Sequence, residues 1–308
     1  MTQPVEAHRV DAHLHLWDLS AGGYAWLTPE LGPLHRSFSP DQARAELEGC
    51  GIASAVLVQA EDSERDTAAM LAVADAHPWV AGVVGWVDLE QPERAEQQLD
   101  RWQGHRAFCG VRSLVHDDPR DDLLELPAVR RSLALLAGRD VPFDVPDAWP
   151  RHLSSVEGLA VALPGLRLVV DHLGKPPAQR EEWQSWRRAL AAVAAHPSTT
   201  AKVSGLQRPG VPFDVSTVRR SWDAALELFG PERLMWGSDW PMTELGAGYA
   251  GTWQVLSALI ADLSASEQAA VLGGTAERVY RLRGPAPSDG SAHAGHGADP
   301  TETRGSSW

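Results

Sequence analysis

Short apolar runs alternate with longer amphipathic stretches along most of this 308-residue chain, and this alternation restricts its fold more than any other feature. Each run is rich in β-branched residues and apolar over several consecutive positions, which is typical of strands covered on both faces. Eight such runs lie at residues 8–13, 53–59, 80–87, 107–112, 141–145, 166–171, 199–204 and 233–238. Strands that alternate with helices predict βαβ units and a parallel sheet.

The stretches between the runs carry helix boundaries. Ser39 before Pro40 combines a capping hydroxyl with a proline in the first turn, which predicts a helix over 40–49. Ser216 precedes a second stretch with apolar residues at helical spacing, which predicts a helix over 216–229.

Eight strands with eight helical connections within residues 1–283 predict a single α/β domain, a (β/α)8 TIM barrel, for which about 250 residues is typical. An open doubly wound sheet is the alternative fold. The sequence disfavours it, because no G-x-G-x-x-G loop follows any of the runs. Residues 284–308 are rich in Gly, Ser, Pro, Asp and His, with almost no aliphatic side chains, and we expect a disordered tail there.

Residues 18–38 form a long connection after the first run, and they carry Tyr24, Trp26 and Leu27. Structureless connections of this length inside a compact domain usually have a function of their own. We therefore expect this segment to fold over the mouth of the barrel as a partial lid.

Composition indicates the kind of partner. The chain has 41 acidic and 27 basic residues, a net charge of -14 and no basic run, which argues against binding to nucleic acid or to an anionic membrane surface. We expect a small-molecule partner. The N-terminal residues lack a basic segment followed by an apolar one, and no apolar stretch reaches membrane length, so we expect a cytoplasmic protein. Oligomeric state is not readable, although exposed tryptophans on a helix over 182–195 would mark a contact.

Active sites of (β/α)8 barrels lie at the C-terminal ends of the strands. The first run ends in Asp11-Ala12-His13-Leu14-His15, and side chains two residues apart on a strand share a face. We therefore expect His13 and His15 to point together into the barrel mouth. Imidazole is a common zinc ligand, so the pair offers a rigid half of a metal or catalytic site. Two ordinary histidines are the alternative.

Asp239 ends the last run, where Gly237-Ser238 and Trp240-Pro241 bend the chain around it. A carboxylate projected from such a bend suits a general base, and the alternative is an ordinary turn aspartate. His172 ends the sixth run and is a third histidine at the same edge, as a metal ligand or a donor to a substrate carbonyl. Asp171 beside it either orients an imidazole or is a buried structural carboxylate.

Arg112 ends the fourth run. A guanidinium in the barrel mouth needs an anionic partner, so Arg112 either binds a substrate carboxylate or lactone oxygen, or forms a salt bridge to Asp88 or Asp144. Lys202, near the end of the seventh run, has the same two interpretations.

Seven segments of the chain, in order over about residues 8–282, resemble the amidohydrolase superfamily. More narrowly, they are similar to the amidohydrolase-related lactonases, a group that includes fuconolactonase, sulfomuconolactone hydrolase and pyrone dicarboxylate lactonase. The segments are VDAHLHLWD (10–18), YAWL (24–27), VVGWVDL (83–89), GVRS (110–113), VVDHLGKP (169–176), KVSGL (202–206) and LMWGSDWPM (234–242).

This resemblance implies a (β/α)8 fold and hydrolysis of a sugar-acid or aromatic-degradation lactone to its hydroxy acid. It implies that Asp239 deprotonates the attacking water and that three histidines hold either the carbonyl oxygen or one divalent metal. The histidines are His13, His15 and His172, and with Asp239 they would be the metal ligands. It further implies that Arg112 binds substrate oxygen and that the pocket is lined by Trp17, Gln59, Trp86 and Trp240. Members of the group differ in their need for metal, so zinc or no metal stays open.

Two other functions compete with lactone hydrolysis. One is a metal-dependent decarboxylase of the same superfamily, in which Arg112 would hold the carboxylate that is lost. The other is a catalytically silent barrel that binds a small acid. The second is disfavoured, because a silent scaffold has no physical need to bury four titratable groups together.

Overall fold

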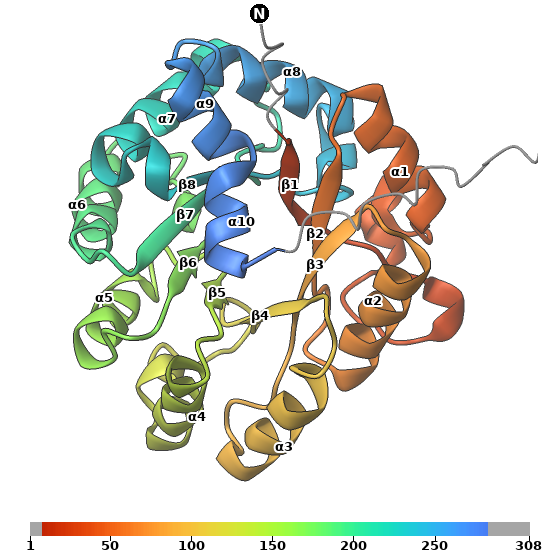
Figure 1. Ribbon diagram of the computed structural model, residues 1–308. Helices are drawn as coiled ribbons and strands as arrows, with labels where there is room; N and C mark the ends of the chain where they lie inside the picture. Colours follow the sequence, from red (N-terminus) through yellow and green to blue (C-terminus); the bar gives the residue numbers. More distant parts are fainter. Residues whose placement is uncertain (1–7, 283–308) are drawn as a thin grey trace, which may run out of the picture.

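The computed structural model describes residues 8–282, and eight parallel strands follow one another around a barrel in chain order (Figure 1). They are β1 Val10–Leu14, β2 Ser54–Val58, β3 Val80–Gly85, β4 Phe108–Arg112, β5 Phe143–Val145, β6 Leu168–Val170, β7 Thr199–Val203 and β8 Leu234–Trp236. Between β1 and β8 the N–H of His15 donates to the carbonyl of Trp240, and the N–H of Asp239 donates to that of His13, both at 2.8 Å. The predicted (β/α)8 barrel is confirmed, and each predicted run overlaps one strand, although β1 extends one residue beyond its run.

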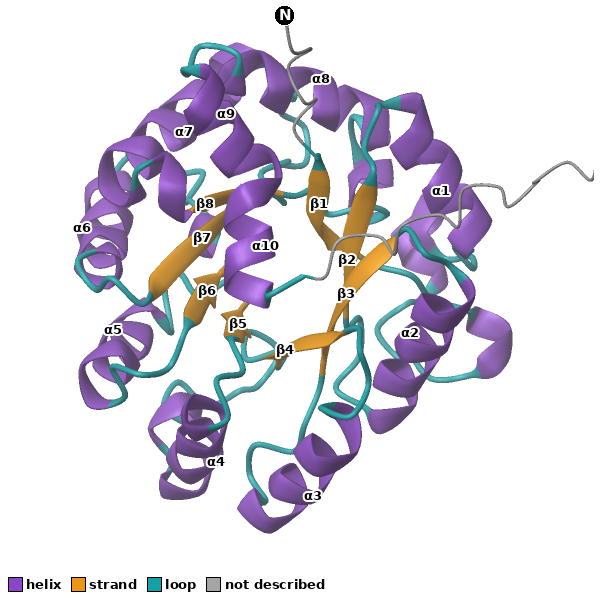
Figure 2. Cartoon of the chain, in the orientation of Figure 1, coloured by secondary structure: helices purple, strands orange, loops and turns teal. Residues whose placement is uncertain are grey.

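Eight helices surround the strands (Figure 2). They are α1 Pro40–Gly49, α2 Glu64–Ala76, α3 Pro92–Trp102, α4 Pro127–Gly138, α5 Leu153–Ala162, α6 Trp183–Ala194, α7 Val215–Phe229 and α8 Gly248–Ile260. Ser39 caps α1 as predicted. The cap of α7 is Asp214 rather than Ser216, because its Oδ1 accepts from the N–H of Thr217 at 2.9 Å.

Side chains alternate between the outer and the inner face of the barrel. In β2, Ala55 and Leu57 belong to the large cluster shared with the helices, whereas Val56 and Val58 belong to a smaller cluster inside the barrel. That inner cluster includes Tyr280 of α10 (Thr275–Tyr280), which follows α9 (Ala265–Ala269). Helix α10 lies across the barrel opening in Figure 1 and closes the end at which β1 begins.

Two expectations about the surface have different outcomes. Trp183 and Trp186 are buried rather than exposed, because the apolar face of α6 turns toward the barrel, and the indole of Trp186 donates to the carbonyl of Leu173 at 3.0 Å. The prediction that exposed tryptophans on this helix mark a contact surface was therefore wrong. The predicted tail, 284–308, lies outside the described residues, so the boundary after residue 283 stays a prediction. Within 8–282, no helix is long and apolar enough to cross a membrane.

Candidate active site

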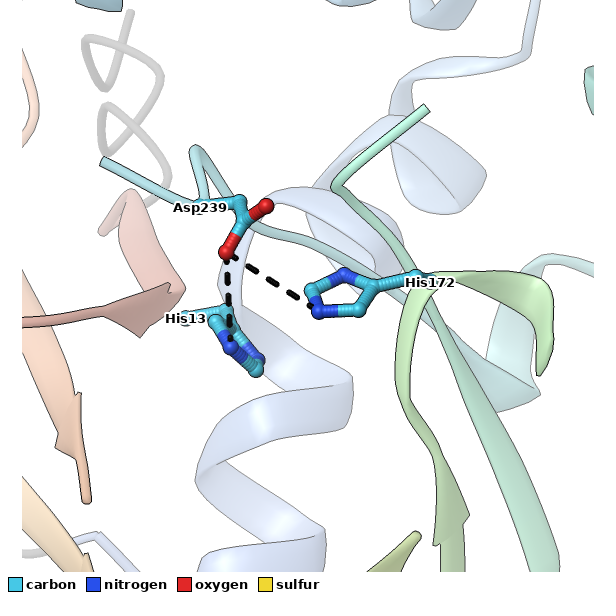
Figure 3. A group of neighbouring side chains, drawn as sticks. All are labelled: His13, His172 and Asp239. Carbon is cyan, nitrogen blue, oxygen red and sulfur yellow. Dashed lines mark ion pairs between the residues drawn. The ribbon is translucent and has the colours of Figure 1, made fainter. Parts of the chain in front are cut away.

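Three histidines and one aspartate come together at the ends of β1, β6 and β8. The Nε2 atoms of His13 and His15 are 3.1 Å apart. Oδ1 of Asp239 lies 3.7 Å from Nε2 of His13, 3.5 Å from that of His15 and 3.9 Å from that of His172. Figure 3 shows His13 and His172 pointing toward the carboxylate of Asp239. The structure thus brings together the four residues that the sequence suggested for catalysis or metal binding.

Two glycines make this approach possible. A Cβ on Gly237 would lie 2.7 Å from Cβ of His13, and one on Gly205 would lie 2.4 Å from Nδ1 of His172. Only glycine leaves that space. His172 and Asp239 themselves have φ of 56° and 59°, a left-handed conformation that costs energy in a residue with a side chain. Surrounding contacts therefore hold both residues in place.

Asp11 fastens β1 to β8 directly beneath the site. Its Oδ1 accepts from the N–H of His13 at 3.0 Å and from that of Ser238 at 2.9 Å. Because the carboxyl is completely enclosed, burial raises the pKa of Asp11 to about 6. The sequence analysis assigned no role to Asp11, although an acidic residue inside an apolar run was a signal for one.

Each imidazole is oriented through its second ring nitrogen. Nδ1 of His15 donates to the carbonyl of Val58 at 2.8 Å, which directs its Nε2 toward the site. Nδ1 of His172 lies 2.9 Å from Oγ of Ser204. Burial lowers the pKa of both His13 and His172 well below its ordinary value, so both rings are neutral near pH 7. Metal-binding histidines are typically held in this way by a second partner.

The donor atoms fit a single divalent cation. Ligands at about 2.0 Å from a tetrahedral zinc ion stand about 3.3 Å from one another. Four of the six separations among these donor atoms are given above, and at 3.1 to 3.9 Å they bracket that spacing. The group whose donor atoms all lie within 4.8 Å of one another consists of His13, His172 and Asp239, with His15 beside it. Neutral imidazoles with one carboxylate are the donors that zinc prefers.

A charged network without solvent contact supports His13 from inside the barrel. Nζ of Lys202 lies 2.6 Å from Oδ2 of Asp144, 3.1 Å from Oδ1 of Asp171 and 3.2 Å from Nδ1 of His13. Tyr280 of α10 donates its hydroxyl to the same Oδ2 at 2.6 Å. Although burial by itself lowers the pKa of an ammonium, the two carboxylates raise the pKa of Lys202 above its ordinary value. Lys202 was predicted either to bind substrate or to form an ion pair, and this geometry corresponds to the ion pair.

Asp171 also contacts Arg112. Its Oδ2 lies 3.5 Å from Nη1 of Arg112, whose Nη2 donates to the carbonyl of Gln59 at 2.7 Å. The salt-bridge partner of Arg112 is therefore Asp171, whereas the salt-bridge alternative had named Asp88 or Asp144. Asp88 lies instead beside Arg94, at 3.5 Å. Oδ1 of Asp171 also lies 3.4 Å from Nδ1 of His13, and the side chain is completely buried, so the structure fits both interpretations of Asp171.

A pocket opens above these residues. Of the predicted site residues, five line it, namely His15, Trp17, Arg112, His172 and Asp239, while His13 lies buried beneath. Gln59, Trp86 and Trp240 lie outside its wall. Gln59 is buried and donates to Asp62 at 2.9 Å, whereas Trp240 packs edge-on against Phe38 and donates to Glu244 at 3.0 Å. Trp86 borders a neighbouring hollow.

The long connection after β1 contributes to this wall, as expected of a lid. Trp26 lines the pocket, and its indole donates to the carbonyl of Ala60 at 2.9 Å. Tyr24 donates its hydroxyl to Oδ1 of Asp66 at 2.6 Å. The loop is thus fastened to the connection after β2, through Ala60, and to the first turn of α2, through Asp66.

The opposite part of the wall was missed by the sequence analysis. It consists of His116, Asp117, Asp147 and Lys175, which lie on the loops after β4, β5 and β6. Only Lys175 belongs to a segment that the resemblance included, and nothing about the other three marked them as pocket residues. Their position on loops at the C-terminal edge of the barrel was the available signal.

The amidohydrolase family model matches residues 10–282. The chain belongs to the amidohydrolase family. It is 33% identical over 291 residues to an L-fucono-1,5-lactonase of Burkholderia ambifaria, covering 93% of this chain and 99% of that protein. It is 27% identical to a 2-pyrone-4,6-dicarboxylate hydrolase of Comamonas testosteroni, over 78% of each chain. A crystal structure of an amidohydrolase from Burkholderia multivorans with bound Zn superposes with a TM-score of 0.82 at 33% identity, over 90% of this chain and all of that one. These relatives support lactone hydrolysis.

Proposed function

We propose that this amidohydrolase opens a lactone to its hydroxy acid with water that Asp239 activates. The observation that carries this proposal is the position of Oδ1 of Asp239, which faces three imidazoles at 3.5 to 3.9 Å on the floor of a pocket. The two curated relatives named above act on cyclic esters, and this chain covers 99% and 78% of them. A lactone is an activated ester, so one base together with stabilisation of the carbonyl oxygen accounts for its opening.

The proposed steps conserve atoms and protons. Asp239 takes a proton from water while the water oxygen bonds to the lactone carbonyl carbon. The negative charge that develops on the carbonyl oxygen is stabilised from the side of His172, whose ring is held by Ser204. The bond from the carbonyl carbon to the ring oxygen then breaks, and Asp239 returns its proton to that oxygen. The new carboxylic acid releases a proton to solvent.

We further infer that the same four residues hold one divalent cation, with zinc as the ion that their donor set fits best. They are His13, His15, His172 and Asp239, and the argument is the spacing of their donor atoms. Such an ion polarises a carbonyl and acidifies water when it is bound. With such an ion bound, His172 would hold the ion rather than contact the carbonyl oxygen itself, and Asp239 would remain the base.

The partner is accordingly a small molecule that enters the pocket. The absence of nucleic-acid and membrane partners and a cytoplasmic location stay predictions from the composition of the chain.

The test is acid release, followed with a pH indicator, over a panel of sugar-acid and dicarboxylic lactones with the purified and the chelated enzyme. Asp239→Asn keeps the size of the side chain and removes the base, so we expect turnover to fall by about 100-fold or more. Asp88→Asn is the matched control, since it removes a carboxylate at the same edge of the barrel but outside this pocket. Full activity of Asp239→Asn would refute the assignment of the base. Carbon dioxide release, in place of simple acid release, would favour decarboxylation.

A further inference from the structure

Two charged residues on the pocket wall have no part in the steps above. Asp147 follows β5 and Lys175 follows β6, and both line the pocket that contains His172 and Asp239. Nζ of Lys175 lies 3.6 Å from Oδ2 of Asp147. Their side chains are 44% and 27% exposed, respectively, so both remain accessible from the pocket.

Both residues share an unusual backbone with the established part of the site. Asp147 has φ of 44° and Lys175 has φ of 63°, in the same left-handed region as His172 and Asp239. Residues with a side chain seldom adopt this conformation, and strained residues of this kind cluster at active sites and ligand-binding segments. Half of the eight such residues in the described part of the chain line this one pocket. The strain therefore places Asp147 and Lys175 with the functional residues.

Backbone hydrogen bonds join the pair to His172. The N–H of Lys175 donates to the carbonyl of His172 at 2.9 Å, and the N–H of Trp149 donates to the carbonyl of Gly174 at 2.8 Å. The second bond ties the loop after β5 to the loop after β6. A group bound by Asp147 and Lys175 would thus be held at a fixed position relative to His172.

The charges on the wall disfavour an anionic substrate. Its carboxylates are Asp117, Asp147 and Asp239, and its cations are Arg112 and Lys175. Arg112 already faces Asp171, and Lys175 already faces Asp147. Burial lowers the pKa of His116, which lies 3.5 Å from Asp117, so that ring adds no charge near pH 7. Away from the proposed cation site, both cations of the described wall already have a carboxylate partner, so that part of the pocket offers no unpaired cation to the second carboxylate of a dicarboxylate.

We propose that Asp147 and Lys175 form a hydroxyl-binding subsite, which makes the pocket selective for uncharged, polyhydroxylated lactones. This inference rests on the proposed lactone hydrolysis. The carboxylate of Asp147 accepts hydrogen bonds from substrate hydroxyls, and the ammonium of Lys175 donates one to a hydroxyl oxygen. A site built to bind hydroxyls discriminates strongly against an analogue that lacks them, because its own polar groups are then left unpaired.

The experiment is a cycle that removes the enzyme group and the substrate hydroxyls separately. Aldono-1,4- and 1,5-lactones are compared with γ-butyrolactone and δ-valerolactone, which have the same rings without hydroxyls, and with 2-pyrone-4,6-dicarboxylate. The enzyme variant is Asp147→Asn, since asparagine tolerates the left-handed backbone. For the aldonolactones we expect kcat/KM to fall by about 10- to 100-fold, mainly through KM, as for one or two hydrogen bonds to a charged group. For the bare rings we expect no comparable loss.

Two further variants keep the outcome clear. Lys175→Met retains the length of the side chain and removes its donors, so it gives the same selective loss even if Asp147→Asn folds poorly. Asp121→Asn is the matched control, an exposed carboxylate paired with Arg151 away from the pocket. Equal losses on aldonolactones and bare rings would overturn the subsite and leave lactone hydrolysis standing, as would faster turnover of the dicarboxylate by the unmodified enzyme. If the enzyme hydrolyses none of these lactones, both proposals are refuted.

Discussion

At the scale of single residues, the candidate site depends on two glycines without a side chain as much as on its histidines and Asp239. Gly205 and Gly237 leave the space that His172 and His13 occupy. From the sequence, Gly237 was predicted only to bend the chain at Asp239, and Gly205 was given no role. His13, His15, His172 and Asp239 were predictable because polar residues that end apolar runs stand out. The need for glycine at a position becomes apparent only when the side chain that packs against it is known.

Gly205→Ala tests this role. The new Cβ would lie 2.4 Å from Nδ1 of His172, at a φ of +57° that also disfavours alanine. We expect the variant to lose about 1–3 kcal/mol of unfolding free energy and at least about 10-fold in kcat/KM, because the ring of His172 must move.

Gly165→Ala is the matched control, since nothing lies within 4 Å of the position of its Cβ. Urea unfolding and lactone turnover are measured for both variants. If Gly205→Ala behaves like Gly165→Ala in both measurements, the close approach of residue 205 to His172 affects neither stability nor turnover.

At the scale of elements, the connection after β1 contributes Trp17 and Trp26 to the pocket without lying in a helix or strand of the barrel itself. Its length and aromatic content predicted a lid. The attachment could not be predicted, because Tyr24 reaches Asp66, 42 residues further along the chain.

Tyr24→Phe should loosen this attachment. It removes the donor to Oδ1 of Asp66, a buried carboxyl whose pKa burial already raises, and we expect a cost of about 1–2 kcal/mol in unfolding free energy. We also expect KM to rise more than kcat falls, since Trp26 is displaced from the wall while Asp239 is not.

Ser20→Ala is the control in the same loop, because Ser20 is exposed and bonds only to Asp18 nearby. Hydrogen exchange over 18–38 reports the loosening directly. Unchanged exchange in Tyr24→Phe would show that Tyr24 does not fasten the loop.

At the scale of the whole molecule, the proposed metal ligands join β1, β6 and β8. The first and last of these strands are more than 200 residues apart in the sequence. An ion that binds only the folded barrel stabilises it by mass action, by about 2.7 kcal/mol at 100 times the dissociation constant. We therefore expect Zn²⁺ to raise the Tm and a chelator to reverse the rise.

His172→Ala should reduce both the Tm shift caused by Zn²⁺ and the amount of bound metal, which is measured by elemental analysis. His196→Ala is a control on the connection before β7, outside the site. An identical Zn²⁺ shift in both variants would exclude His172 as a ligand.

The sequence by itself determined the barrel, the number and approximate positions of its strands, and the four residues that meet at its mouth. Hydrophobic periodicity is a local property, and in a closed parallel barrel every strand ends at the same edge, so residues that end strands are brought together by the topology alone. Only the tertiary structure decided that Arg112 pairs with Asp171 and Lys202 with Asp144, and that Asp147 and Lys175 rather than Gln59, Trp86 and Trp240 line the pocket. Charge pairing and pocket lining depend on distances of a few ångströms between separate loops, and no local pattern in a chain encodes those distances.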